Sequence, residues 1–340
     1  MAWNASRAAA VRDPAAWTLV GDDRPRPASG DSSASAEPAP GTSLALPDAE
    51  AFCRKIATGH YENFSVLSWL VPSDLRQDFA NVYAFARWSD DLADESADPE
   101  EATRALGAWR RELDACGRRE ASHPILVALT ETIRRHQLEL TPFHDLLDAF
   151  VQDQHVVRYE TREQLIDYCR RSANPVGRIV LALAGCRDPQ RLAESDAICT
   201  GLQLVNFWQD IRRDREAGRI YLPLADMHRH GVAEADLDAT SANSRLQLLL
   251  SEEVAWAEAC FDTGEPLISR GPRSLQPAIA AFAGGGRAVV QAIRRSGYDT
   301  LSRRPVVSKT KKLSLALGAV VRRLCSALPG SGGPSEAGGT

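Results

Sequence analysis

The chain has 340 residues, of which 44% are hydrophobic and 25% charged, and its formal net charge is −5. This length suits one large domain or two small ones, and the composition is that of an ordinary globular protein. The charge gives no indication of a nucleic-acid partner, and we expect none. Seven cysteines without a C-x-x-C pair indicate neither a zinc site nor a disulfide framework, so we expect buried thiols in a reducing compartment.

Both ends of the chain differ in composition from the middle. Residues 1–46 are rich in Ala, Pro, Ser, Gly and Asp, and this composition predicts a disordered N-terminal extension. Residues 1–20 lack the unbroken apolar core of a secretory signal. No stretch reaches the roughly 18 to 20 apolar residues of a membrane helix. We therefore expect a cytoplasmic protein.

Helix signals dominate between the two ends. Pro47-Asp48 and Pro72-Ser73-Asp74 are typical helix starts, as is Thr141-Pro142, and each is followed by apolar residues at helical spacing. Longer periodic runs cover residues 192–211 and 246–261. Since no alternating strand or hairpin signal is present, the sequence predicts an all-α fold with one domain over about 47–312.

The first chemically informative motif is a cluster of four carboxylates in residues 90–95. On a helix, Asp90 and Asp94 are one turn apart and share a face, as do Asp91 and Glu95. Like charges at this spacing repel, and a cation would relieve the repulsion. Oxygen ligands without His or Cys suit Mg²⁺. The alternative is a solvated acidic helix end.

The second motif places polar residues on one face of an otherwise apolar helix. Asn206, Asp210 and Asp214 follow one another at one-turn spacing, and Gln203 lies one turn before Asn206. An apolar helix that admits these residues in register is expected to line a polar cavity. The alternative is a polar stripe on the surface.

Two acidic helices suggest a shared task. Mg²⁺ binds one or two protein carboxylates and leaves other positions for water or phosphate, so the two motifs could hold a diphosphate between them. Loss of diphosphate leaves a carbocation, which requires an apolar, aromatic-lined pocket. The candidates for that lining, each also compatible with plain core, are Phe64, Tyr83, Phe85, Phe207 and Trp208.

Cations accompany the acidic residues. Arg87 lies one turn before Asp91, where it would either balance charge or hold a phosphate oxygen. A run of basic residues lies near the C-terminal end, and it would either form a solvated face or attract anionic lipid. It consists of Arg303, Arg304, Lys309, Lys311 and Lys312.

Together these motifs resemble the squalene/phytoene synthase family, which joins or processes prenyl diphosphates. The resemblance runs from about His60 to Lys312, and the paired Asp-x-x-x-Asp motifs are specific in combination. Residues 60–64 are similar to the family's N-terminal flap motif, and residues 82–87 and 218–223 are typical stretches next to the two acidic motifs.

The resemblance implies an isoprenoid synthase-type helical bundle around a central cavity, with a prenyl diphosphate as substrate and Mg²⁺ as cofactor. It also implies a role for individual residues. Asp90, Asp94, Asn206, Asp210 and Asp214 would hold the metal and its diphosphate; His60, Phe64, Arg87 and Gln203 would contact substrate; Tyr83 would line the cavity.

One segment departs from the general family pattern. Where squalene and phytoene synthases usually carry a Tyr and later a Gly, this chain has Arg171 and Asn174, and Pro175 is expected to break the helix. The segment 170–177 is similar to bacterial hydroxysqualene synthases of the hopanoid pathway. That likeness implies that Arg170 or Arg171 holds diphosphate and Asn174 helps to position water; the alternative is arginines on a helix surface.

The sequence therefore supports three functions. The leading one is hydroxysqualene synthase, in which water captures the cation formed from presqualene diphosphate, handed over by a presqualene diphosphate synthase. The second is condensation of two prenyl diphosphates to presqualene diphosphate or phytoene. The third is a non-catalytic helical partner that binds prenyl lipid. Residues 313–328 would form either an interfacial helix at the inner face of the membrane or a packing helix, before a disordered tail that ends at 340.

Overall fold

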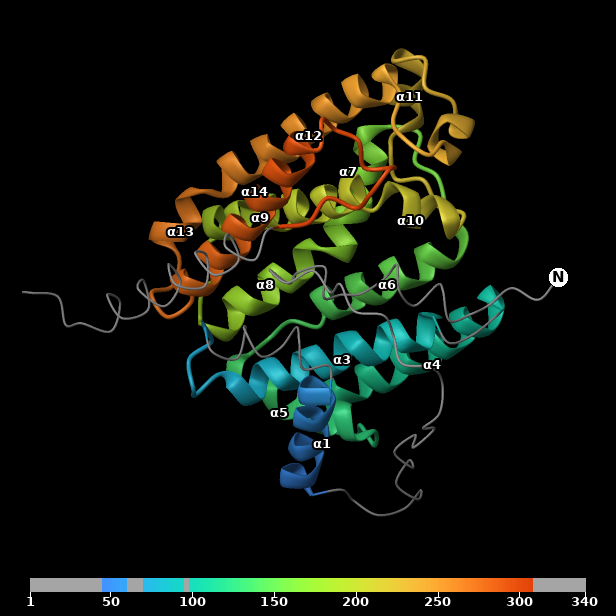
Figure 1. Ribbon diagram of the computed structural model, residues 1–340. Coiled ribbons are helices and arrows are strands. Elements are labelled where there is room, and N and C mark those ends of the chain that lie inside the picture. The colour runs from blue at the N-terminus through green and yellow to red at the C-terminus, as the bar shows by residue number, and fades with distance from the viewer. Residues whose placement is uncertain (1–44, 60–69, 95–97, 308–340) are drawn as a thin grey trace, which may run out of the picture.

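The computed structural model describes residues 45–59, 70–94 and 98–307, and every element within these ranges is a helix (Figure 1). The predicted all-α fold is confirmed. The helices, in chain order, are α1 (Leu46–Gly59), α3 (Arg76–Asp94), α4 (Pro99–Arg118), α5 (Pro124–His136), α6 (Thr141–His155), α7 (Arg162–Ser172), α8 (Asn174–Leu183), α9 (Pro189–Gln209), α10 (Ile211–Glu216), α11 (Leu224–Arg229), η3 (Glu234–Asp238), α12 (Ser244–Gly264), α13 (Pro266–Arg270) and α14 (Gln276–Arg295).

The helix starts follow local chemistry. Where the sequence predicts helices from Pro47, Thr141 and the run 246–261, the structure has α1, α6 and α12. Several starts carry a side-chain cap, which satisfies one of the backbone N–H groups that a helix leaves without partners. Asp188 accepts a hydrogen bond from the backbone N–H of Arg191 at the start of α9, and Asn243 caps α12 in the same way.

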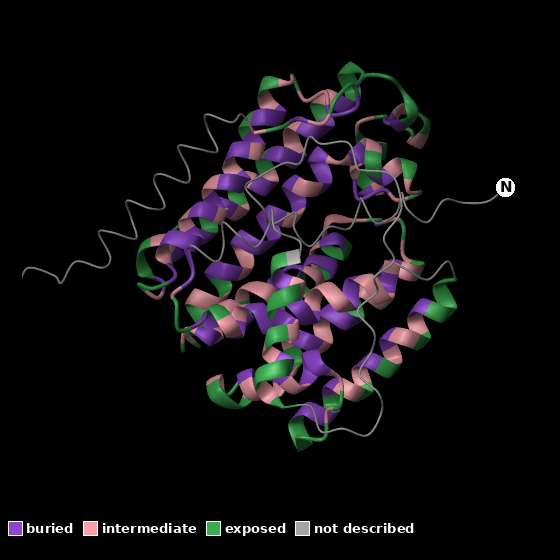
Figure 2. Ribbon diagram, turned by 60° about the horizontal axis from the view of Figure 1, so that its bottom comes forward, coloured by how far each residue is buried: buried purple, intermediate pink, exposed green. Residues whose placement is uncertain are grey.

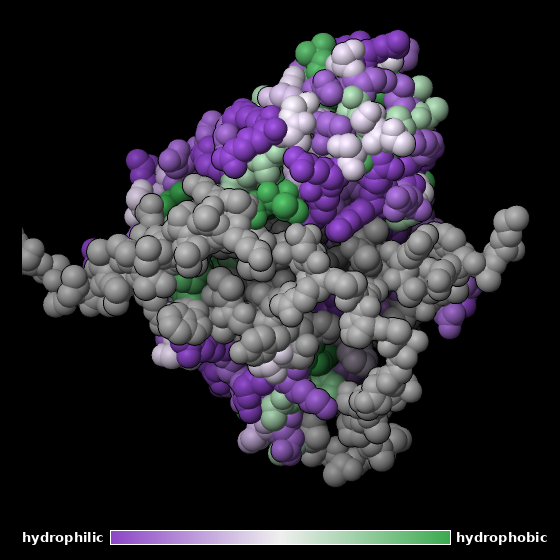
Figure 3. Space-filling model, in the orientation of Figure 1, coloured by the Kyte–Doolittle hydropathy of each residue, from purple (hydrophilic) through white to green (hydrophobic). Residues whose placement is uncertain are grey.

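The helices enclose two hydrophobic cores. The first core lies among α1, α3, α4, α5 and α6 and includes Phe85 and Leu129; the second lies among α7, α9, α12 and α14 and includes Leu204 and Leu250. Figure 2 shows buried residues on the helix faces that meet and exposed residues on the outer faces. The visible surface over α11 and α12 is mostly hydrophilic (Figure 3). The apolar faces predicted from periodicity are thus the faces that are buried.

Helices α6 and α8 join the two cores. In α6, Leu147 belongs to the first core and Ala149 to the second; in α8, Ile179 and Leu181 divide in the same way. Helix α6 contacts α3 and α4 on one side and α7 and α8 on the other. Its position between the two groups of helices is visible in Figure 1. The last turn of α6 is therefore well placed to connect elements from both halves.

Helix α9 is the central element of the second core, because it packs against α7, α8, α12, α13 and α14. Two of its crossings depend on glycine. A Cβ at Gly264 would lie 2.4 Å from Cγ1 of Ile198, and a Cβ at Gly286 would lie 2.3 Å from Cζ of Phe261 and 2.9 Å from Cδ2 of Leu202. Close helix approach at these points leaves no room for a methyl group.

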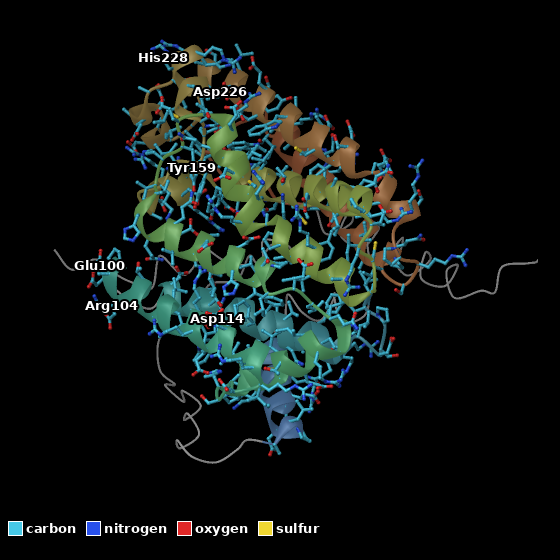
Figure 4. The ribbon with its side chains drawn as sticks, turned by 180° about the vertical axis from the view of Figure 1, so that it is seen from behind. Glu100, Arg104, Asp114, Tyr159, Asp226 and His228 are labelled. Atoms are coloured by element: carbon cyan, nitrogen blue, oxygen red, sulfur yellow. The ribbon has the colours of Figure 1, made fainter. Side chains whose placement is uncertain are left out.

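Short helix α11 is fixed to the second core by one arginine. Arg162 of α7 donates from Nε to Asp226 of α11 at 2.7 Å and from Nη2 to Glu253 of α12 at 2.9 Å. Its guanidinium also lies 4.9 Å from the ring centroid of Trp256. Figure 4 shows Asp226 on α11, above Tyr159. The arrangement keeps the loop that leads into α11 against the second core.

Several sequence predictions fall outside the described residues. These are the disordered extension, except for residues 45 and 46, and the helix and tail over 313–340. The six described cysteines are free thiols, four of them buried. Within the described ranges, none of the helices is both long and apolar enough to cross a membrane.

A Gly286→Ala substitution should destabilise the protein. The added methyl gains about 1 kcal/mol of helix propensity but clashes with the buried Phe261 ring, and overpacking costs about 1–3 kcal/mol, so the net effect is a loss. Chemical denaturation measures it. Gly107→Ala is the control, since a Cβ there meets nothing nearer than Nη1 of Arg111 at 3.9 Å, and it should raise the free energy of unfolding. Equal effects at both positions would contradict this packing.

Glu253 should make stability fall as pH rises. Burial raises the pKa of Glu253 from 4.5 to about 7, although Arg162 opposes the rise. Between these values the unfolded chain loses the proton more readily than the folded one, so the free energy of unfolding decreases by an amount on the order of 2 kcal/mol. Glu253→Gln removes this titration. Melting curves from pH 5 to 8 should show the natural protein losing stability relative to the variant; a relative gain would mean that Arg162 outweighs burial.

Candidate active site

The first acidic motif occupies the C-terminal end of α3. Asp90 is buried, and Asp91 and Asp94 are half-buried. Arg87 lies 2.6 Å from Asp91 and 3.6 Å from Asp90. Burial disfavours the Arg87 cation, but the charges of Asp91 and Asp90 prevail and raise its pKa. Of the two roles considered for Arg87, charge balance is the one visible in these contacts.

The second acidic motif spans a helix break, which corrects the prediction of one continuous helix over 192–211. Helix α9 ends at Gln209, and Asp210 has φ −107° and ψ 16° before α10 begins. The one-turn spacing nevertheless survives. The N–H of Asp210 donates to the carbonyl of Asn206 at 3.0 Å, and the N–H of Asp214 donates to that of Asp210 at 2.9 Å.

The polar stripe before this break is the accessible side of α9. Over residues 198–209 every residue is buried except Gln203 and Asn206, which are half-buried. The stripe is therefore the accessible face of an otherwise buried stretch of helix. That this face lines a polar cavity stays a prediction.

Asp210 and Asp214 lie in different environments. Arg304 donates two hydrogen bonds to the Asp210 carboxylate, from Nε at 2.6 Å and from Nη2 at 2.9 Å. Nη1 of Arg213 lies 3.6 Å from the same carboxylate. Asp214 is buried, and burial raises its pKa well above the usual range, with the charges of Asp210 and Asp153 adding to the rise. The site thus contains one paired carboxylate beside one that is costly to ionise without a cation.

The last turn of α6 connects both motifs. Gln154 donates from Nε2 to the carbonyl of Ala93, between Asp90 and Asp94, at 3.3 Å. The preceding residue, Asp153, is near enough to raise the pKa of Asp214. Two neighbouring residues of one helix therefore reach the two acidic motifs, which are more than 110 positions apart in the sequence.

Aromatic side chains gather beside the second motif. Phe207 and Tyr221 stack with ring centroids 3.8 Å apart and planes 9° apart, while Tyr159 and Tyr168 lie 5.8 and 6.1 Å from Tyr221. Tyr168 donates its hydroxyl to Asp153 at 3.0 Å, and burial raises the pKa of Tyr168, so the phenol keeps this proton. We call Tyr159, Tyr168, Phe207 and Tyr221 the aromatic cluster.

Sequence reasoning found only part of this cluster. Phe207 was a lining candidate, whereas Tyr159 and Tyr168 were not singled out; Tyr221 lies in the stretch 218–223, which offered the only signal. All four cluster residues are buried in the second core, and two other lining candidates are core residues as well. Phe85 is packed between Trp109 and Phe143, and Trp208 is fully buried with its Nε1 donating to the carbonyl of Glu253.

The segment 170–177 breaks between two helices, as Pro175 predicted. Helix α7 ends at Ser172 and α8 begins at Asn174. Arg171 donates to Gln152 of α6 at 2.6 Å and to Asp167 at 2.7 Å. Asn174 is buried and accepts a hydrogen bond from Thr200 of α9 at 3.0 Å.

The remaining predicted site residues lie in different environments or outside the described ranges. Arg170 is mostly exposed and lies 3.8 Å from Asp167, as the helix-surface alternative predicted. Tyr83 is half-buried on α3. His60 and Phe64 lie outside the described residues. Arg304 belongs to the basic run that was expected either to be solvated or to attract anionic lipid. That expectation is wrong for Arg304, because its guanidinium binds Asp210 and Gln209.

The donor chemistry of both motifs fits a hard cation. Carboxylate and amide oxygens are what Mg²⁺ prefers, and a cation would offset the burial cost of Asp214. Across the described ranges no group of three or more His, Cys, Asp or Glu side chains is arranged to hold a metal ion. Mg²⁺ commonly takes only one or two protein carboxylates and completes its shell with water and phosphate oxygens, so these residues fit it.

Arg304→Gln should lower the free energy of unfolding by about 1.5–3 kcal/mol, because it removes hydrogen bonds to the charged Asp210. Urea denaturation measures the loss. The neighbouring Arg303 is exposed, so Arg303→Gln should change stability by no more than about 0.5 kcal/mol. If the two variants behave alike, the pairing of Arg304 with Asp210 does not stabilise this part of the fold.

Comparison with known proteins agrees with this architecture. The squalene/phytoene synthase family profile matches residues 57–311. A hydroxysqualene synthase from Zymomonas mobilis is 32% identical over 79% of this chain and 90% of the relative. A 15-cis-phytoene synthase from Synechocystis is 28% identical over 89% of this chain and 93% of the relative.

Solved structures give the same result. The squalene synthase HpnC from Alicyclobacillus acidocaldarius has a TM-score of 0.72 and 43% identity, covering 74% of this chain and 95% of that one. A dehydrosqualene synthase in complex with ligand has a TM-score of 0.73 and 25% identity, covering 81% and 96%. Because the family profile spans most of the chain and includes both acidic motifs, this protein belongs to the squalene/phytoene synthase family of isoprenoid biosynthetic enzymes.

Proposed function

We propose that this chain is a hydroxysqualene synthase, which converts presqualene diphosphate and water into hydroxysqualene and diphosphate. The observation that carries the proposal is the segment 170–177, which has Arg171 and Asn174 where family members usually have Tyr and Gly. The likeness to the Zymomonas hydroxysqualene synthase and to the HpnC structure supports it.

The reaction begins with cleavage of a C–O bond, whose electron pair leaves with the diphosphate. Asp90, Asp94, Asn206, Asp210 and Asp214 would hold Mg²⁺, which supplies positive charge against the departing diphosphate. Arg87, already turned toward the first motif by Asp91, is the cation best placed to bind a phosphate oxygen there. His60, Phe64 and Gln203 are the further substrate contacts in this proposal.

The cation that remains must be protected until its skeleton has rearranged. In this proposal the rings of the aromatic cluster would stabilise the positive charge by cation–π attraction. Tyr83 would line the cavity that the family resemblance implies, from α3. Because these side chains are fixed by packing and by the Tyr168–Asp153 hydrogen bond, they need little reorganisation as charge develops.

Water then attacks the rearranged cation, forms the new C–O bond and loses one proton, whereas hydride would have formed a C–H bond. Asn174, held in place by Thr200, is the candidate for orienting this water. Arg171 is bonded to Gln152 in the last turn of α6, and it would hold the diphosphate from the α7 side. Arg170 is exposed near Asp167, and it would have to leave that position to bind the diphosphate.

Condensation of two prenyl diphosphates is the second candidate, since phytoene synthases are also among the similar relatives. The Synechocystis enzyme matches over 89% of this chain, and a Mycobacterium tuberculosis phytoene synthase is 32% identical over 74% of it. Both reactions need the same acidic motifs. They differ in the substrate and in whether water captures the cation.

Purified protein incubated with presqualene diphosphate and Mg²⁺, without any reductant, should release diphosphate and form hydroxysqualene. Asp210→Asn and Asp90→Asn should each lower the rate by about 10²-fold or more, because each removes a charged ligand from the diphosphate site. Product identification by mass spectrometry and a diphosphate release assay measure both effects.

The matched control is Asp188→Asn, which keeps a capping side chain at the start of α9 and should retain the full rate. Product formation from farnesyl diphosphate alone would favour the condensation reaction. Absence of any product from either substrate would favour a non-catalytic, lipid-binding partner. Full activity in both aspartate variants would contradict the site assignment.

A further inference from the structure

The C-terminal end of α3 is an unfavourable place for negative charge. The last carbonyl groups of a helix have no intrahelical donors, and the macrodipole puts partial negative charge there. Helix α3 ends with Asp90, Asp91 and Asp94 and has no basic residue in its last turn. Arg87 offsets part of this charge from one turn further back. The last carbonyls of α3 can therefore accept hydrogen bonds from donors outside the helix.

Gln154 of α6 supplies one such donor. Its Nε2 lies 3.3 Å from the carbonyl oxygen of Ala93, one of the last four carbonyls of α3, and 3.2 Å from the carbonyl of Phe150, one turn back on α6. Ala93 is buried and Gln154 half-buried, so water competes little for the bond. The amide thus bridges two helices through two N–H groups.

The residues next to Gln154 hold the last turn of α6 in place. Gln152 accepts from Arg171 of α7, Asp153 accepts from Tyr168 of α7, and His155 lies 3.3 Å from Oγ1 of Thr103 on α4. Four consecutive side chains therefore bind three other helices. An amide on such a turn holds the end of α3 in a defined place relative to the rest of the bundle.

We propose that Gln154 is a positioning residue, whose side-chain amide holds the last turn of α3, and with it Asp90 and Asp94, in a fixed position relative to α6. This inference rests on the proposed function, since it assigns Gln154 to the same diphosphate site. The residue touches neither substrate nor metal. It acts through the backbone between the two aspartates. Its loss should therefore lower the affinity for metal and diphosphate, with a smaller effect on the free energy of unfolding.

The test compares Gln154→Ala and Gln154→Glu with the natural protein. Alanine removes the donors, and glutamate has the same shape but turns donors into acceptors and adds negative charge. The probe is inorganic pyrophosphate with Mg²⁺, added to the protein while its melting temperature is recorded. Both variants should need about tenfold more pyrophosphate for half of the maximal thermal shift, as is typical for groups that orient metal ligands.

Gln276 provides a matched control. Its Nε2 also donates to two backbone carbonyls, those of Ser269 at 2.8 Å and Gly271 at 3.1 Å, at the end of α13. Helix α13 and the end of α3 lie at opposite ends of the bundle in Figure 1. Gln276→Ala and Gln276→Glu should therefore keep the natural pyrophosphate dependence, whatever they do to the melting temperature of the free protein.

Kinetics separate positioning from general stability. With presqualene diphosphate as substrate, the Mg²⁺ concentration for half-maximal rate should rise about tenfold in the Gln154 variants, while the rate at saturating Mg²⁺ stays within about threefold. An unchanged Mg²⁺ and pyrophosphate dependence in both Gln154 variants would overturn the inference. So would equal weakening in the Gln276 variants.

The two proposals fail in distinguishable ways. If the natural protein binds Mg²⁺ and pyrophosphate, and the Gln154 variants bind them less well, the inference stands even where no hydroxysqualene forms. If hydroxysqualene forms but the Gln154 variants bind pyrophosphate normally, the proposed function stands and the role of Gln154 is wrong. If the natural protein neither binds Mg²⁺ and pyrophosphate nor forms hydroxysqualene, both are wrong.

Discussion

Three aspartates lie at the C-terminal end of α3 and two around the α9–α10 break. Like charges repel within each group, and the dipole of α3 adds to the repulsion at its own end. Much of the surrounding structure offsets this charge. Arg87 binds the first group, Arg304 binds Asp210, and Asp214 is buried where ionisation is costly. Such repulsion lowers the free energy of unfolding. In the proposed function, binding of a metal-bound diphosphate would offset this loss.

Packed helices hold most of this charged region in place, and Arg304 adds a contact from the segment after α14. Helix α6 lies between the two cores, and its last turn binds α3, α4 and α7. Helix α9 brings Gln203 and Asn206 to its accessible side, while close crossings at Gly264 and Gly286 fix its depth in the second core. Positions set by packed helices vary less than positions set by loops, and this suits a site whose ligands come from distant parts of the chain.

Membership of the squalene/phytoene synthase family explains the two acidic motifs but leaves the choice of reaction to other residues. Relatives named as phytoene synthase and as hydroxysqualene synthase both match most of this chain, so family membership alone does not decide the reaction. In this chain Arg171 joins α7 to the last turn of α6, and Asn174 joins α8 to α9. Arg171 lies on α7, which carries Tyr168, and Asn174 is bonded to α9, which carries Phe207, so both residues are connected to helices of the aromatic cluster.

The sequence by itself determined the helical class, the starts of several helices and the spacing of both acidic motifs. These are local properties, set by capping side chains and by the 3.6-residue period within one turn or two. It could not determine that Arg304 binds Asp210, that Gln154 reaches Ala93 or that Tyr159 joins Tyr168 and Tyr221. Nor did periodicity reveal the break at Asp210, because the pattern of side chains continues through it. Those features depend on contacts between residues far apart in the chain, and only the packing of helices around the two cores decides which of them meet.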